Sequence, residues 1–523
     1  MAFERHARTV SLLTLLSRIT GVGRDAAISR VFGAGMLTDA FFFAFLVPNL
    51  FRRLFGEGAL AAAFLPAFSR LDRDDPARAR SLATITIGAL AAGLGVAVLI
   101  AEVILFLVSM RQDHANLAVW LTMIMLPYTP LVCVVAVLGA LLQVRGRFGP
   151  TAAAPVLLNG CLIAAAVGGA VWLGGESERE RLVHIGLVAA AVIVAGVFQV
   201  AWSLIASRPA SWWTADRRSG ALAFRRMGRD VLPMILGLGV LQVNTLLDGL
   251  IASYPTIVGA TIFGRDYPLA EGSMAAVSFA QRLYQFPLGV FGIAVATAIF
   301  PALARLATDA GGFASTVQRG LRLVVFIGLP ASAGLILVRS PLAAAILEGG
   351  HFGRADTERV SFVLLGYAPA IWAYSMVHVC TRAFYARHET MTPVRVAVAV
   401  VALNLVLNCT LIWTPLRESA LAWSTAVCAV VQAFALLGLL GRRVGPLGGR
   451  VITASWIRTA VATAVMTAAV MVIASFMPDE RTWATSTLWL GAMVVTGLVV
   501  YATAAFALRM PELSWALGRA RAD

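Results

Sequence analysis

The sequence has no lysine, so all 42 of its basic side chains are arginines. We interpret this absence as a bias of genomic composition rather than as part of a mechanism. Charge of either sign is also scarce, because 13% of the residues are charged and 59% are hydrophobic. Soluble globular domains carry about 25% charged residues. The composition therefore excludes an ordinary soluble domain and predicts a polytopic membrane protein.

Cysteine pairs and clustered acids are missing too. The five cysteines lie in or beside apolar runs, without CxxC or Cys/His spacing, so neither a disulfide framework nor a metal site is expected. A membrane enzyme of lipid-linked sugar metabolism would need paired acids or a His/Asp cluster near one face, and the sequence has neither. We therefore predict that the chain is not an enzyme. The cysteines are Cys133, Cys161, Cys380, Cys409 and Cys428.

Long apolar runs dominate the chain. They lack the period-2 alternation of a transmembrane barrel and reach the length of about 20 residues with which a helix crosses hydrocarbon. The fold class predicted is all-α. The clearest runs are Leu117–Val144, Ala152–Gly175, Ile185–Ser207, Val396–Pro415, Ser419–Gly441, Thr459–Pro478 and Trp483–Leu508.

The net charge of +15 comes from arginines in short loops rather than in one basic domain, which argues against a nucleic-acid partner. Arginine-rich loops alternate along the chain with loops that are poorer in arginine or balanced by acids. Because cytoplasmic loops collect positive charge, this alternation predicts fourteen spans with both termini in the cytoplasm.

Two internal echoes indicate a repeat. Ala63–Leu71 resembles Ala298–Leu306, and Arg145–Pro150 resembles Arg387–Pro393, each six predicted spans later. Because six is an even number of spans, the second copy of the repeat crosses the membrane in the same orientation as the first. We therefore expect two six-helix lobes as parallel repeats, with a substrate cavity at their shared face. The expected boundaries are residues 1–207 and 230–441 for the lobes, 208–229 for a cytoplasmic amphipathic linker, and 451–509 for two additional spans.

The first two spans carry arginines that a bilayer should reject. Arg18 and Arg24 lie in the first, whereas Arg52 and Arg53 share one stripe of the second with Asn49. A guanidinium at bilayer depth costs about 2.5–3.5 kcal/mol on insertion scales, so it is retained where it faces water, a partner or a ligand.

A further arginine, Arg282, stands in the predicted eighth span among apolar residues. Guanidinium forks bind phosphate or diphosphate in a bidentate manner, which predicts an anion site. The alternatives are that some arginines reach the membrane interface, or pair with the acids Asp25, Asp39 or Glu57.

Asp39 begins the second span, and Glu57 follows Arg53 by one turn. Asp39 could cap its own helix or close an outer gate, and Glu57 could pair with Arg53 or belong to the gate. Both residues are gate candidates.

Polar residues of the other predicted lobe form a second group. Oxygen ligands of this kind suit a monovalent cation such as sodium, whereas interhelical hydrogen bonds are the alternative. The candidates are Asp248, Asn404, Asn408 and Ser424.

Motifs in the first two spans resemble a known family. Ser17–Asp25, Phe32–Phe42, Pro48–Ala59 and Phe64–Pro66, with Arg282 and Pro287 in the eighth span, are similar to the MurJ (MviN) family of bacterial lipid II flippases. This family belongs to the multidrug/oligosaccharidyl-lipid/polysaccharide exporter superfamily. Its members often carry acids around the eighth-span arginine, whereas this chain has Gln281 and Gln285.

The resemblance implies a flippase of the bacterial inner membrane that moves undecaprenyl-diphosphate-linked peptidoglycan precursor (lipid II) to the outer leaflet by alternating access. It assigns Arg18, Arg24, Arg52 and Arg282 to the headgroup cavity, Asp39 to the outer gate, and the two additional spans to a groove for the lipid tail. It implies no cofactor beyond a coupling sodium ion or the membrane potential, and it names membrane lipids and the cell-wall synthesis machinery as partners.

A cation-coupled multidrug exporter of the same superfamily, or an exporter of another lipid-linked oligosaccharide, is the alternative. A drug exporter should have twelve spans and an acidic cavity, and the arginines and the additional spans argue against it. A scaffold that does not transport would have no use for arginines inside its spans.

Overall fold

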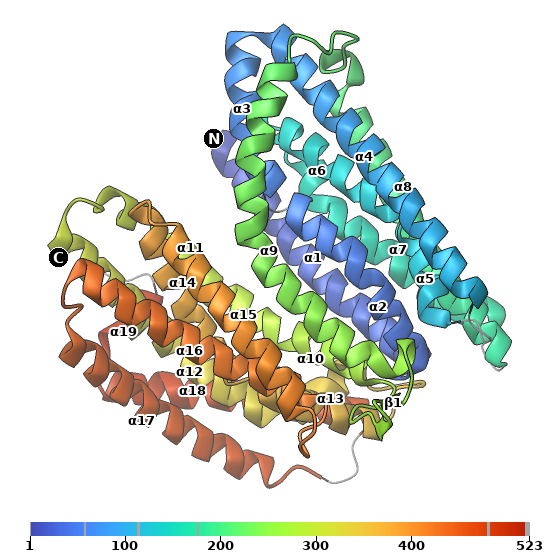
Figure 1. Cartoon of the computed structure of the whole chain (residues 1–523). Helices are drawn as coiled ribbons and strands as arrows, with labels where there is room; N and C mark the ends of the chain where they lie inside the picture. The colour runs from blue at the N-terminus through green and yellow to red at the C-terminus, as the bar shows by residue number, and fades with distance from the viewer. Residues whose placement is uncertain (1, 57–58, 112–115, 175–176, 479–481, 518–523) are drawn as a thin grey trace. The chain divides into compact units, whose positions relative to one another are not determined.

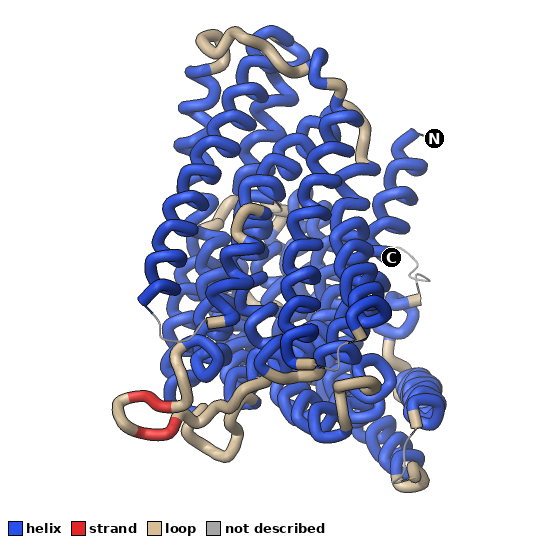
Figure 2. The backbone as a smooth tube through the Cα atoms, turned by 90° about the vertical axis from the view of Figure 1, so that its right-hand side faces the viewer, coloured by secondary structure: helices blue, strands red, loops and turns tan. Residues whose placement is uncertain are grey.

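The chain is almost entirely helical. The computed structural model describes residues 2–56, 59–111, 116–174, 177–478 and 482–517, and in these ranges the β-structure is limited to one short hairpin and one isolated bridge. Figure 2 shows the hairpin at the end of long helices. The predicted all-α class is confirmed.

The chain divides into two compact units, unit 1 with residues Met1–Ala275 and unit 2 with residues Ala276–Asp523 (Figure 1). The elements of unit 1 are α1 (Ala2–Phe32), α2 (Met36–Phe51), the π-helical turn η1 (Arg52–Gly56), α3 (Ala59–Asp74), α4 (Pro76–Arg111), α5 (Leu117–Met125), α6 (Tyr128–Val144), α7 (Gly149–Leu173), α8 (Glu178–Ser207), the 3-10 turn η2 (Pro209–Ser211), α9 (Ala221–Ile257), β1 (Thr261–Ile262) and β2 (Arg265–Asp266).

Helix α10 (Ser273–Pro287) begins in unit 1 and continues into unit 2. The further elements of unit 2 are the π-helical turn η3 (Leu288–Gly292), α11 (Ile293–Arg305), α12 (Ala310–Leu347), α13 (Arg354–Tyr367), α14 (Ala370–Ala386), α15 (Met391–Leu411), α16 (Ser419–Val444), α17 (Gly449–Ala474), α18 (Trp483–Ala507) and α19 (Pro511–Ala516).

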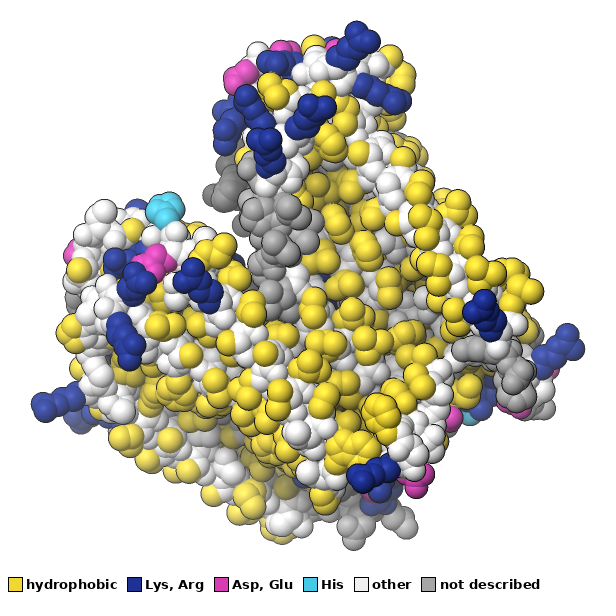
Figure 3. Space-filling view, in the orientation of Figure 1, with side chains coloured by type: hydrophobic (Ala, Val, Ile, Leu, Met, Phe, Trp, Pro, Cys, Tyr) yellow, Lys and Arg dark blue, Asp and Glu magenta, His cyan; other side chains and the backbone are white. Residues whose placement is uncertain are grey.

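Nine helical segments in the described ranges are long and apolar enough to cross a membrane, and the bent pair α13 and α14 would make a tenth. The elements that carry the predicted site arginines, α1, η1 and α10, are not among the nine. Figure 3 shows that most of the visible surface is hydrophobic and that arginines gather at helix ends. The chain is thus a multi-pass membrane protein, and the count of fourteen spans stays a prediction.

Two helices near the predicted site arginines are broken in the same way. Helix α2 contains Pro48 and gives way to η1, and α10 ends at Pro287 and gives way to η3. A proline removes a backbone donor and clashes with the preceding turn, and π-helical turns often accommodate such a break at functional sites.

The segment 208–229 connects α8 to the body of α9, and its amphipathic role stays a prediction. It consists of η2, an irregular stretch, and then the first turns of α9. The Trp212 side chain is buried in the unit 1 core, and its backbone oxygen accepts a hydrogen bond from Thr84. The Ser81 hydroxyl accepts a hydrogen bond from the Gly220 amide at 3.0 Å. Tertiary packing and these bonds therefore fix the segment on α4.

Helix α9 packs against α2, α3 and η1 and so belongs to unit 1. In Figure 1 it runs alongside α2 and α3. The first unit therefore extends to Ala275, beyond the boundary at residues 229–230 expected from the sequence. The division into two six-helix lobes stays a prediction.

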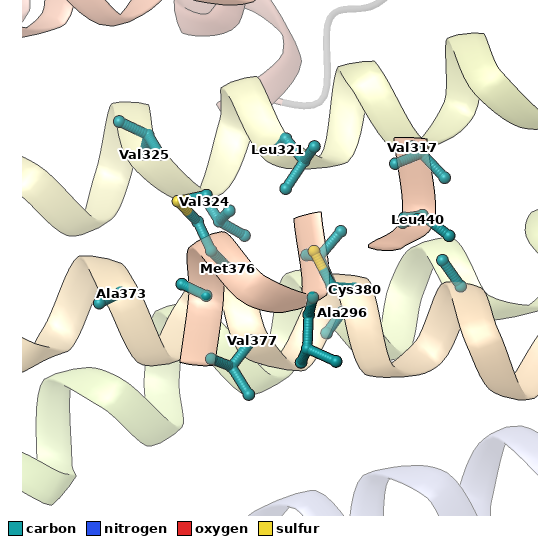
Figure 4. Packing of buried hydrophobic residues seen from close by; sticks show 14 of the residues in the cluster. Ala296, Val317, Leu321, Val324, Val325, Ala373, Met376, Val377, Cys380 and Leu440 are labelled. Atoms are coloured by element: carbon teal, nitrogen blue, oxygen red, sulfur yellow. The ribbon is translucent and has the colours of Figure 1, made fainter. Parts of the chain in front are cut away.

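The core of unit 2 forms where α12, α14 and α16 pack together. Figure 4 shows Val317, Leu321 and Val324 of α12 facing Met376 and Cys380 of α14. Helices α17 and α18 pack on each other and on α12. The short helix α19 is held by Glu512, whose carboxylate accepts hydrogen bonds from Arg322 of α12 and Ser455 of α17.

Candidate functional site

Arg24 is buried in unit 1 and its guanidinium is engaged within that unit. Its Nε and Nη2 donate to Asp25 Oδ1 at 2.9 and 2.6 Å, and its Nη1 donates to Asn159 Oδ1 of α7 at 3.1 Å. Arg24 and Asp25 are 5% and 4% exposed. This geometry corresponds to the alternative in which the arginine pairs with Asp25.

Arg18 lies on the same helix but in a different environment. Its side chain is partly buried, whereas that of Arg24 is buried. The α1 helix is continuous through Gly21 and Gly23, where it packs on α7: a Cβ on Gly21 would lie 3.6 Å from Asn159 Nδ2. The glycines thus permit close packing of α1 on α7.

Asn49 and Arg52 meet as the sequence predicts. The Nε and Nη2 groups of Arg52 donate to Asn49 Oδ1 at 3.2 and 3.0 Å, and the Arg52 side chain is partly buried. The π-helical turn η1 begins at Arg52 and includes Arg53, which is also partly buried. Glu57 lies outside the described residues.

Arg282 belongs to unit 2 and is exposed. It lies on α10, near Tyr284, whose ring stacks on Tyr367 of α13 with centroids 4.7 Å apart. The stacked tyrosines fix the middle of α10 on unit 2.

Asp39 is fully buried and holds the beginning of α10. Its Oδ2 accepts hydrogen bonds from the Gly272 amide at 2.6 Å and the Thr256 hydroxyl at 3.1 Å, and its Oδ1 accepts one from the Ala275 amide at 2.7 Å. The first amides of a helix lack intrahelical partners and carry the positive end of the dipole, so a carboxylate suits them. Asp39 therefore caps α10, although the sequence suggested that it could cap its own helix.

The four sodium-site candidates are divided between the units. Asp248 is buried on α9 in unit 1, where it accepts a hydrogen bond from Asn244 at 3.2 Å. In unit 2, Asn408 donates to Asn404 at 2.9 Å, and the Ser424 hydroxyl donates to the Ala420 carbonyl of its own helix. The described residues contain no group of three or more His, Cys, Asp or Glu side chains that could hold a metal ion.

Four partners of the site residues were missed by the sequence analysis: the side chains of Asn159 and Thr256 and the backbone amides of Gly272 and Ala275. Asn159 is a single amide in the apolar run of α7, and a lone polar residue in such a run is the signal that could have indicated it. Thr256 and the amides of Gly272 and Ala275 carry no comparable signal, because threonine is common in apolar spans and backbone groups occur in every residue.

Comparison with known proteins agrees with the resemblance found in the motifs. The family model described as "Lipid II flippase MurJ" matches residues 28–493. A Vibrio cholerae protein named "Probable lipid II flippase MurJ" is 32% identical, over 95% of this chain and 93% of that protein. The "Lipid II flippase MurJ" of Burkholderia cenocepacia is 30% identical, over 84% of each chain.

Solved structures agree at the level of the fold. A structure described as "Lipid II flippase MurJ, inward closed conformation" has a TM-score of 0.78 at 20% identity and covers 96% of this chain. An inward-facing multidrug resistance MATE family transporter of the MOP superfamily has a TM-score of 0.63 at 13% identity and covers 84%. The family model and the relatives together show that the chain belongs to the MurJ family of lipid II flippases, which are transporters and not enzymes.

Proposed function

We propose that this chain flips lipid II, moving the undecaprenyl-diphosphate-linked peptidoglycan precursor from the inner to the outer leaflet of the bacterial cytoplasmic membrane by alternating access. The observation that carries the proposal is the match of the MurJ family model over residues 28–493. A headgroup of diphosphate, sugars and peptide cannot cross hydrocarbon unaided, so it needs a polar path through protein.

The topology in this proposal has fourteen spans and cytoplasmic termini. The nine apolar spans and the α13–α14 pair account for ten. The other four are α1, α9, and the two broken segments α2–η1–α3 and α10–η3–α11. The similar breaks in the last two support the six-span repeat.

The headgroup is bound by arginines in this proposal. Arg18, Arg52 and Arg53 are partly buried and Arg282 is exposed, so a ligand can reach their guanidinium groups. Planar guanidinium groups fit the oxygens of a diphosphate, and Asn49 holds the Arg52 guanidinium in position. The buried pairing of Arg24 with Asp25 and Asn159 supports a positioning role, in which Arg24 fixes α1 on α7.

Asp39 serves as the outer gate in this proposal, with Glu57 as a second gate residue. Support comes from the amides that Asp39 holds, which belong to Gly272 at the end of the α9–α10 connection and to Ala275 in the first turn of α10. A carboxylate bound by amides and a hydroxyl can be released without separating an ion pair, as an opening gate requires.

Helices α17 and α18 supply the groove for the lipid tail. They pack on α12 through the cluster of Val338, Met466, Val470 and Met493. Large apolar side chains, such as Leu488 and Leu498 of α18, stay exposed and suit an isoprenoid chain.

A sodium ion or the membrane potential would drive the cycle. The bonds of Asn404 with Asn408 and of Ser424 with Ala420 support the alternative, in which these residues stabilise unit 2. Replacement of sodium by choline, with Asp248→Asn as the matched variant, tests the coupling ion. If the transport rate is unchanged in choline and in Asp248→Asn, sodium is excluded as the coupling ion.

The deciding experiment is translocation of lipid II by the purified chain in liposomes. Arg52→Gln and Arg282→Gln should each lower the rate about tenfold or more, and Arg52→Lys should not restore it, because an ammonium cannot bind two oxygens in a fork. Arg73→Gln and Arg305→Gln, at exposed arginines outside the proposed site, are the controls and should match wild type.

Transport that persists with Arg18, Arg52 and Arg282 all replaced would refute the arginine site. Absence of lipid II transport by the folded wild-type chain, together with export of cationic drugs, would favour the drug-exporter alternative, for which the MATE fold similarity is the supporting observation.

A further inference from the structure

The connection between α9 and α10 contains a hairpin with an unusual tip. Thr261 pairs with Asp266 and Ile262 pairs with Arg265, and the Tyr267 amide donates to the Ala260 carbonyl at 2.7 Å. The two tip residues, Phe263 and Gly264, have φ of +49° and +75°. Positive φ at both central positions is the signature of a type I′ turn, whose twist matches that of the strands.

Phenylalanine is poorly suited to this position. The left-handed region is adopted readily by glycine and also by asparagine and aspartate, whereas a bulky side chain is strained there. The Phe263 side chain is 98% exposed, so no packing against the described part of the chain offsets the strain. A strained, fully exposed aromatic residue at a hairpin tip indicates a contact outside the chain.

The hairpin is mounted rigidly on the end of α9. The rings of Tyr254 and Tyr267 stack with centroids 4.3 Å apart. The Tyr254 hydroxyl donates to the Thr261 carbonyl at 3.2 Å, and the Tyr267 hydroxyl donates to the Ile251 carbonyl at 2.9 Å. The position of Phe263 is therefore set by α9.

The surroundings identify the contact as lipid. Tyrosines are enriched where spans meet the membrane interface, and Tyr254 and Tyr267 mark that level at the end of α9. The adjoining Val258 is 65% exposed, and the exposed Arg265 beside the tip can pair with a lipid phosphate. Each strand of the hairpin has two residues and is therefore about 7 Å long. This length matches the thickness of the headgroup layer, which is about 5–8 Å on each side of the hydrocarbon.

We infer that the hairpin of residues 260–267 is an interfacial anchor, with Phe263 inserted among the headgroups and first methylenes of the leaflet at which α9 ends. In the proposed topology this is the outer leaflet. The inference goes beyond lipid II transport, since it concerns bulk lipid and requires only that α9 spans the membrane.

The anchor acts on the segment that Asp39 holds. The same connection continues from the hairpin to Gly272 and Ala275, whose amides donate to Asp39. Lipid thus restrains one end of this segment and the buried carboxylate holds the other.

Depth-resolved quenching tests the anchor. In a background with Cys161 and Cys409, the two cysteines that are not buried, changed to alanine, Phe263→Cys carries an environment-sensitive fluorophore, and the protein is reconstituted in phosphatidylcholine and phosphatidylglycerol vesicles. Ala270→Cys, an exposed position of the same connection, is the matched control. Shallow nitroxide lipids should quench the label at 263 at least threefold more than the label at 270, and aqueous iodide should quench in the reverse order.

Equal iodide quenching at both positions would overturn the anchor, because the tip would then face water and a soluble partner. Shielding of position 263 from both quenchers would overturn it in favour of a protein contact, such as a second copy of the chain. Neither readout depends on transport, so failure of the anchor is distinguishable from failure of the flippase proposal.

A second pair of variants tests the restraint without labels. Phe263→Asn suits the turn better and keeps the hairpin folded, whereas Phe263→Trp keeps an interfacial aromatic ring. In lipid nanodiscs, Asn should speed hydrogen exchange of the Gly272 and Ala275 amides about 3–10-fold, and Trp should leave it unchanged. Equal exchange in wild type and Phe263→Asn would overturn the restraint.

Discussion

Two of the buried carboxylates of unit 1, Asp25 and Asp39, are stabilised by different partners. Asp25 faces an arginine on its own helix, and that arginine also binds Asn159 of α7. Asp39 accepts hydrogen bonds from the Thr256 hydroxyl at the end of α9 and from two backbone amides at the beginning of α10, those of Gly272 and Ala275. Both side chains are almost inaccessible to solvent.

The difference concerns what each contact would cost to break. The ion pair lies within α1, and it holds in place the guanidinium that donates to Asn159 of α7. Loss of either member would leave an uncompensated buried charge, so the pair suits a permanent joint between α1 and α7. Bonds between a carboxylate and amides are exchangeable for water when the segment moves. We therefore interpret Asp25 as belonging to a fixed joint and Asp39 as belonging to a releasable one, and three substitutions test this reading.

The largest effect is expected for Arg24→Ala. It removes the cation beside the buried Asp25 carboxylate, and loss of one partner of a buried pair typically costs about 3–5 kcal/mol. Thermal or denaturant unfolding in lipid nanodiscs should show this destabilisation. The double variant Arg24→Ala/Asp25→Ala should be more stable than Arg24→Ala alone, because the orphaned charge is gone.

A different outcome would break the comparison. If Arg24→Ala unfolds like wild type and loses only lipid II transport, then Arg24 acts on substrate as the sequence motif suggested, and the joint between α1 and α7 does not need it.

An intermediate effect is expected for Asp39→Asn. The amide oxygen can still accept hydrogen bonds, but bonds to a charged acceptor contribute about 1.5–3 kcal/mol and neutral ones about 0.5–1.5 kcal/mol. The contacts to Gly272 and Ala275 should together weaken by about 2–3 kcal/mol. Hydrogen exchange of these two amides should therefore accelerate by more than tenfold, while global unfolding shifts less than in Arg24→Ala.

Slow exchange in Asp39→Asn, equal to wild type, would mean that the charge contributes nothing to the link. Asp39 would then be an ordinary buried helix cap, and its assignment to a gate would lose its support.

The fold class followed from the sequence because it depends on composition and run length, which are properties of the chain itself. The scarcity of charge and the long apolar runs predict a helical membrane protein, and the described residues agree. Pro48 and Pro287 mark where two helices are broken, but a proline does not by itself predict the π-helical turns that follow.

The site residues were only partly predictable, because local sequence patterns indicate contacts only between residues that are close together in the chain. Asn49 and Arg52 are one turn apart on a helix, so their contact follows from spacing. Asn159 lies 135 residues from Arg24, and no local pattern pairs them. The partners of Asp39 include backbone amides, which have no residue signature, and the grouping of α9 with unit 1 depends on packing against α2 and α3.

The smallest expected effect belongs to Thr256→Val, which removes one of the Asp39 contacts while nearly preserving side-chain shape. The Thr256 hydroxyl donates to Asp39 Oδ2 at 3.1 Å, and the Gly272 amide donates to the same oxygen at 2.6 Å. Because the oxygen keeps a shorter bond, we expect a loss of about 1 kcal/mol in unfolding free energy, within the range for one hydrogen bond. Thr256→Ser, which keeps the hydroxyl, is the matched control and should recover most of the loss. If Thr256→Val instead destabilises as much as Arg24→Ala, the contacts around Asp39 form a cooperative buried network, and a fixed joint would describe both carboxylates.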